Sequence, residues 1–180
     1  MVWKTLRFRV LFRFEFRQDE AGRKAGFILS FYFGEMMKRK YKHESEVLDL
    51  VHSFEDATVP HDDWKHAEHL VVALYYLCNH DLDTAYEKMR AGILNLLEHG
   101  FKVDLTKEMP YHETITLFWM RTVADFNGSK NGASLLEKAN EVAYKWDKDY
   151  PLRFYSRELL FSDEARATFV KPDLEASQER

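Results

Sequence analysis

The stretch "WKHAEHLVVALYYL", residues 64–77, places the strongest constraint on the fold of this chain. Pro60 breaks the chain before it, Asp62 or Asp63 can cap a helix, and the apolar run continues through Cys78. A helix with this composition has to bury itself against other elements. It cannot do so in a bilayer, because no stretch of the chain reaches the roughly eighteen apolar residues that a membrane span needs.

Other segments that follow residue 38 also have helical spacing of their apolar residues. Predicted helices span about residues 40–54, Asp81 or Asp83 to Gly100, Pro110 to about Phe126, and about Ala133 to Trp146, before a short tail in which Ser162 caps "DEARATF". The chain has no glycine-rich phosphate loop, heptad seam or internal repeat. The sequence therefore predicts an all-α protein, a single bundle of five or six helices.

The first 35 residues have a different pattern. In "RFRVLFRFEFR" apolar and charged residues alternate, which is the period of a half-buried strand. A lone hairpin of this kind would leave an open edge with nothing to pair it. Met36 and Met37 then open "MMKRKYKHESEV", which looks like a natural protein start. Two interpretations remain: residues 1–35 form a β-hairpin, or they are an extension outside a helical domain of residues 36–180.

Length and charge limit the class of protein. A chain of 180 residues has the size of one domain. Its 26 basic and 30 acidic residues give a net charge of −4, without the basic footprint of a nucleic-acid-binding protein. The single cysteine, Cys78, excludes an internal disulfide framework and fits a reducing compartment. We expect a cytoplasmic protein that binds neither nucleic acid nor a membrane, and the sequence leaves a homo-oligomer open.

Histidines supply the main candidate for a site. His66 and His69 lie three residues apart and therefore share one helix face, and His112 opens a different helix in "PYHETIT". Imidazoles so placed can bind one metal ion if another element completes the ligand set. Glu55 is a better fourth ligand than Glu113. Glu113 directly follows His112, and consecutive residues on a helix point about 100° apart, so these two are not expected to bind the same metal ion. The sequence thus predicts a site for zinc, iron, nickel or copper, with a hydrogen-bonded histidine pair as the alternative.

Three further residues are candidates for catalysis. Glu113 could act as a general base or orient a ligand, although a carboxylate in the first turn of a helix also favours its dipole. Tyr155 and Arg166 lie in "FYSRELLFSDEAR", where the arginine could bind an anionic group or form an ion pair between helices. Cys78 makes a poor nucleophile because it lies among apolar residues in mid-helix.

The blocks "FE", "WKHAEHL", "YHETIT", "YSRELLFSDEAR" and "PDL", in this order, resemble a family of small, uncharacterised bacterial proteins with W-x-H-x-x-H-L and Y-H-E-T-I-T motifs. The resemblance covers about residues 47–174. By position, the polar blocks of the family fall on Glu55, His66, His69, His112, Glu113, Tyr155, Ser162 and Arg166. The resemblance implies a shared polar site and supplies no reaction.

Three functions fit these residues. The first is a metal-dependent enzyme that acts on a small molecule. In the second, the same histidines act as acid–base or hydrogen-bonding groups in a metal-free pocket for a small-molecule ligand. The third is a structural or interaction module with hydrogen-bonded core histidines. Metal content separates the first function from the others, and ligand binding by the metal-free protein separates the second from the third.

Overall fold

A computed structural model describes residues 39–174, and every regular element in that range is helical. The α-helices are α2 (Glu44–Glu55), α3 (His66–Asn79), α4 (Leu82–Asn95), α5 (Glu113–Ser129), α6 (Leu135–Lys145), α7 (Arg157–Leu160) and α8 (Asp163–Ala167). Shorter helical turns are η1 (His61–Asp63), η2 (Leu96–Gly100) and η3 (Tyr150–Arg153). The all-α prediction is confirmed for this range. The predicted hairpin or extension of residues 1–35 lies outside the described residues.

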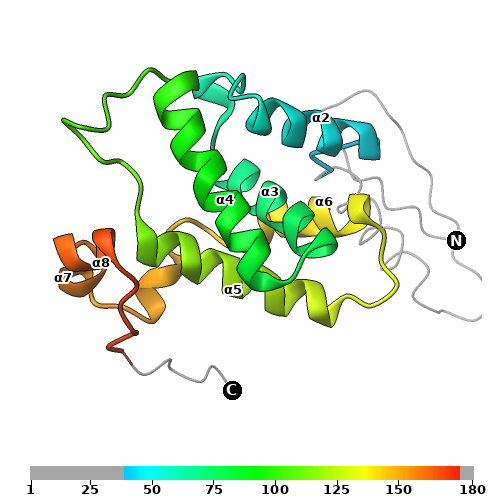
Figure 1. Cartoon of the computed structure of the whole chain (residues 1–180). Helices are drawn as coiled ribbons and strands as arrows, with labels where there is room; N and C mark the ends of the chain where they lie inside the picture. The colour runs from blue at the N-terminus through cyan, green and yellow to red at the C-terminus, as the bar shows by residue number, and fades with distance from the viewer. Residues whose placement is uncertain (1–38, 175–180) are drawn as a thin grey trace, which may run out of the picture. The chain divides into compact units, whose positions relative to one another are not determined.

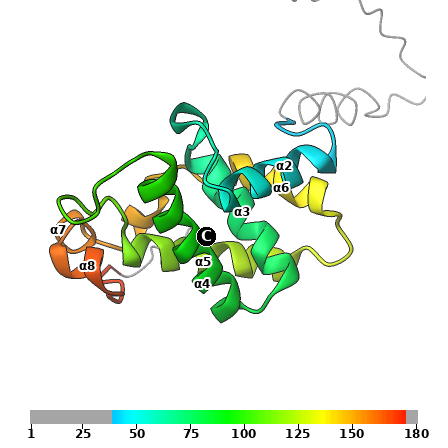
Figure 2. The same ribbon diagram turned by 45° about the horizontal axis from the view of Figure 1, so that its top comes forward.

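Helix α3 lies in the interior of the bundle. Residues 70–74 of this helix are all buried, and five consecutive helical positions point in every direction around the axis. Helices α2, α4, α5 and α6 all pack against α3, as Figure 1 shows. The turned view in Figure 2 shows α2 and α6 close together on one side of it. The apolar stretch at residues 64–77, which places the strongest constraint on the fold, therefore lies at its centre.

The surrounding helices each bury one stripe, with residues three or four positions apart. These stripes consist of Val47, Val51 and Phe54 in α2, Ala85, Met89 and Ile93 in α4, and Ala139, Val142 and Ala143 in α6.

Among residues 39–174, no helix combines the length and the apolar content that crossing a bilayer requires.

Two predicted helix starts are confirmed by the capping contacts. The Asp81 carboxylate accepts a hydrogen bond from the backbone N–H of Thr84 (2.8 Å) at the start of α4. The Ser162 hydroxyl accepts one from the N–H of Ala165 (3.1 Å) at the start of α8. Both caps satisfy amides that the first turn of a helix leaves without a partner.

Two other predicted starts are wrong. Asp62 and Asp63 lie in the η1 turn and do not cap α3, which begins only at His66. There the Glu68 carboxylate accepts a hydrogen bond from the N–H of Lys65 (3.2 Å), which is one half of a capping box. Helix α5 begins at Glu113 and not at Pro110, because the side chain of His112 provides the cap.

We expect the substitution Gly92→Ala to destabilise the protein. A methyl group at this position of α4 would overlap the ring of Phe54, which is fully buried and stacked on Trp64 with ring centroids 4.9 Å apart. Because the ring has no room to move, we expect a loss of about 1–3 kcal/mol in the free energy of unfolding, measured with urea. The control is Gly128→Ala in α5, where no atom lies within 4 Å of the added methyl group. It should be neutral or gain up to about 1 kcal/mol. Equal effects of the two changes would contradict this packing.

Candidate functional site

Both ring nitrogens of His112 are used by the backbone. Nδ1 accepts a hydrogen bond from the N–H of Ile115 (3.3 Å), and Nε2 lies 2.8 Å from the carbonyl oxygen of Leu160. A carbonyl can only accept, so Nε2 carries the proton and the ring is neutral. The side chain therefore caps α5 and ties this helix to α7. It points inward as the sequence predicts, but no ring lone pair remains for a metal ion.

The other two predicted histidine ligands also contact backbone carbonyls. Nε2 of His66 donates to the carbonyl of Trp146 (3.2 Å), and its ring packs 4.7 Å from that of Trp119. Nδ1 of His69 donates to the carbonyl of residue 65 (2.8 Å), and its ring lies 4.1 Å from that of Trp64. Although the two residues share a helix face, different partners hold the two rings.

The structure does not bring the four predicted metal ligands together. Glu55 is exposed at the end of α2, where its carboxylate accepts a hydrogen bond from the hydroxyl of Tyr76 (3.2 Å). Within residues 39–174, no three His, Cys, Asp or Glu side chains gather in a way that could hold a metal ion. His66, His69, His112 and Glu55 instead take part in four separate hydrogen bonds, and metal binding stays a prediction.

Glu113 lies in a polar cluster that joins α4 to the start of α5. Its carboxylate accepts hydrogen bonds from the hydroxyls of Tyr86 and Tyr111, the latter at 3.0 Å, and lies 3.5 Å from Nε of Arg90. Burial raises the pKa of Tyr111 to about 12, so this phenol stays a hydrogen-bond donor at neutral pH. The sequence indicated Glu113 but none of its three partners.

Arg166 lies on α8 beside the segment that leads into α5. Its Nη1 is 3.5 Å from the carbonyl oxygen of Met109. Burial, and after it the charge of Arg166, lowers the pKa of His112. Of the three predicted catalytic residues, only Tyr155 lines the pocket described next, so Glu113, Tyr155 and Arg166 do not form one site.

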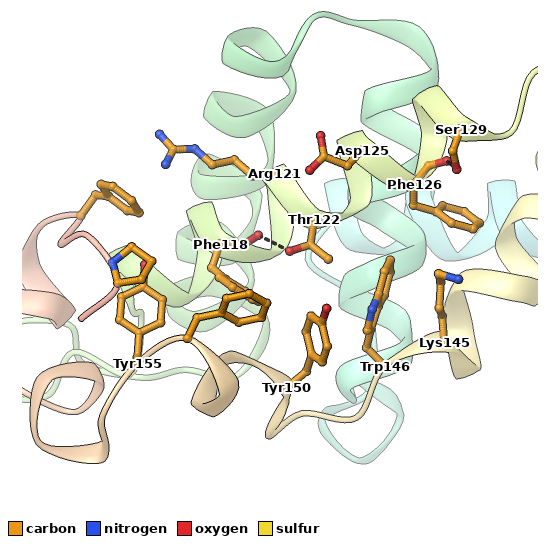
Figure 3. Close-up of a pocket in the computed structure, with 13 residues that line it drawn as sticks. Phe118, Arg121, Thr122, Asp125, Phe126, Ser129, Lys145, Trp146, Tyr150 and Tyr155 are labelled. Carbon is orange, nitrogen blue, oxygen red and sulfur yellow. Dashed lines mark hydrogen bonds between the residues drawn. The ribbon is translucent and has the colours of Figure 1, made fainter. Parts of the chain in front are cut away.

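A pocket of about 460 Å³ lies between α5 and the segment that follows α6 (Figure 3). Its walls are mainly aromatic, with Phe118 on the α5 side and Trp146, Tyr150 and Phe154 on the other. The centroids of Tyr150 and Phe154 are 5.4 Å apart, as are those of Phe118 and Phe154. Rings at these distances support one another, which gives the pocket a preformed apolar wall.

The C-terminal segment closes one side of this pocket. Phe169 and Pro172 contribute to its lining. The Tyr155 hydroxyl donates to the carbonyl of Val170 (3.0 Å), and the N–H of Leu174 donates to the carbonyl of residue 154 (3.0 Å). Burial raises the pKa of Tyr155, so its hydroxyl remains a donor that holds the segment in place. Tyr155 is therefore a structural part of the pocket wall.

Several polar groups of the pocket have no hydrogen-bond partner among the described residues. These groups are the hydroxyl of Tyr150, the indole N–H of Trp146, the guanidinium of Arg121 and the carboxylate of Asp125. Figure 3 shows Arg121 and Lys145 toward opposite ends of the row of rings. A concave apolar surface with a few polar groups is the usual form of a small-molecule site.

No protein-family model matches this chain, and comparisons with curated proteins and with solved structures find no similar protein. The resemblance to a bacterial family inferred from the sequence blocks stays a prediction.

The contacts of His112 predict that this residue acts on folding. We expect His112→Ala to lower the free energy of unfolding by about 1–3 kcal/mol, because α5 loses its cap and the Leu160 carbonyl loses its donor. His112→Asn can restore the cap and should lose less. His99→Ala, at an exposed position, is the control. Metal analysis after exposure to zinc, iron, nickel and copper completes the test. Stoichiometric metal that disappears in His112→Ala without a change in stability would contradict the structural role.

The histidines also predict a pH dependence of stability. Burial lowers the pKa of His69 to about 4, and it lowers the pKa values of His66 and His112. An unfolded histidine has a pKa near about 6.5, so between pH 6.5 and pH 4 the unfolded chain binds more protons than the folded one. The free energy of unfolding should therefore fall as the pH falls through this window, by at most about 3 kcal/mol from His69, because the partial exposure of this ring reduces the effect.

Urea unfolding at intervals from pH 7 to pH 5 measures this slope above the range in which carboxylates titrate. His69→Gln should show a smaller slope than the wild type. Stability that stays constant or rises from pH 7 to pH 5 would contradict the lowered pKa values.

Proposed function

We propose that this protein binds a small, planar aromatic molecule, without a metal ion, in the pocket between α5 and the segment after α6. The observation that carries the proposal is an open pocket of about 460 Å³ with aromatic walls. Clefts and cavities that bind small ligands typically measure about 300–1,000 Å³. Stacking between flat rings gives such a ligand a favourable geometry beyond the burial of apolar area.

The free polar groups support an oriented ligand. The hydroxyl of Tyr150 and the indole N–H of Trp146 lie on the same wall and have no partner among the described residues. Each can donate one hydrogen bond to a ligand that lies along the rings. A ligand that accepts these bonds gains orientation as well as burial.

The histidine contacts favour binding without metal over the metal-dependent enzyme. His66, His69 and His112 each have a backbone carbonyl as partner, which explains their presence in a helical core. The three residues predicted to be catalytic do not gather at one place. We therefore propose a binding protein, and the metal analysis above remains the test of the alternative.

We further propose that the protein works in the cytoplasm. Cys78 lies at the exposed end of α3, and partial desolvation of its sulfur raises the pKa of the thiol, which leaves it protonated and suited to a reducing compartment. A homo-oligomer stays a proposal that sedimentation can test.

Two pocket variants test ligand binding. Isothermal titration with 2-naphthylmethanol, a neutral planar probe, should show binding to the wild type that weakens at least roughly tenfold in Trp146→Ala, which removes one ring of the wall. Thr122→Trp should block the probe by filling the pocket from α5, and it removes no core side chain.

The matched control is Tyr144→Ala, which removes an exposed ring from α6 outside the pocket. It should bind the probe like the wild type. No binding to the wild type, or equal binding by Trp146→Ala, Thr122→Trp and the control, would overturn the proposal.

A further inference from the structure

We infer that the ligand of this pocket is a planar aromatic carboxylate, whose anionic group is bound by Arg121. The inference rests on the proposed function and adds the charge of the ligand and the residue that recognises it.

Arg121 is held in place without an ion pair. Its guanidinium lies over the ring of Phe169, 4.4 Å from the ring centroid. Among the described residues, no carboxylate lies within ion-pair distance of it, and no carbonyl accepts from it. A guanidinium that stacks through its face keeps its N–H edges available, and these edges match the two oxygens of a carboxylate.

The nearest acid in the helix does not neutralise this arginine. Asp125 follows Arg121 by four positions, where opposite charges can pair. An arginine that precedes the acid is, however, the less favourable order of the two, and the structure shows no ion pair between them. Figure 3 shows the guanidinium of Arg121 directed away from Asp125. With its face on the ring of Phe169 and no ion pair to Asp125, the guanidinium of Arg121 has N–H groups available to bind an anionic ligand.

The charged lining of the pocket favours an anion. Arg121 and Lys145 are cationic and only Asp125 is anionic, so the lining carries net positive charge. Lys145 lies 3.8 Å from the carboxylate of Glu141, which partly satisfies it. Arg121 lies near the wall residue Tyr155, where its charge opposes the effect of burial on the phenol. An aromatic carboxylate that stacks on the rings can thus reach a cation that lacks a counter-charge.

Three naphthalene probes of matched size test the inference: 2-naphthoate, neutral 2-naphthylmethanol and cationic 2-naphthylmethylammonium. In titrations of the wild-type protein, naphthoate should bind roughly tenfold more tightly than the alcohol, and the ammonium should bind most weakly. Arg121→Gln should abolish the advantage of naphthoate and leave the affinity for the alcohol within roughly twofold. Asp125→Asn removes a like charge and should tighten naphthoate binding.

Arg157→Gln is the matched control. Its guanidinium also lies over a phenyl ring, 5.2 Å from the centroid of Phe161, but outside the pocket. It should keep the preference for naphthoate. Tightest binding of the ammonium, or a preference for naphthoate that survives Arg121→Gln, would overturn the inference and leave the pocket as proposed. Failure of all three probes to bind would overturn the proposed function itself.

Discussion

The apolar residues 70–74 of α3 leave no face of this part of the helix for solvent, so four other helices have to cover it. Helices α2, α4 and α6 have 12, 14 and 11 residues, lengths at which an isolated helix is marginal in water. Their stability comes from the stripes that they bury against α3. The first turn of α3 is anchored in turn by Glu68, whose carboxylate contacts the N–H of Lys65 and lies 2.6 Å from Nζ of Lys40.

The helices were predictable because the spacing of apolar residues is a local property of the sequence. The errors concern the starts of α3 and α5, where the capping residues differ from those that the sequence favours. Histidine is an uncommon cap, so the sequence favoured Pro110 over His112 as the start of α5. Asp62 and Asp63 have the usual capping chemistry but lie in the preceding turn. The pattern showed correctly that His112 points inward, but it could not show that the partner is a carbonyl 48 residues away along the chain.

The pocket was harder to predict because its walls come from distant segments. Phe118 and Phe169 lie on separate elements, and nothing in their local patterns joins them. One readable signal was present, since Trp146, Tyr150 and Phe154 recur every four residues around a proline that prevents a continuous helix. Of the residues predicted for catalysis, only Tyr155 reached this pocket, and it serves there as a support.

The C-terminal wall of the pocket has a consequence for biosynthesis. Phe169 and Pro172 are translated after every other residue that lines the pocket. Domains fold from the N-terminal side as the nascent chain emerges, so α3 can gather its neighbours before this wall exists. Until it arrives, the aromatic row from Phe118 to Tyr155 faces water. Exposed apolar surface of this kind makes a folding intermediate prone to aggregation and to chaperone binding. Synthesis and docking of Phe169 and Pro172 end this exposure.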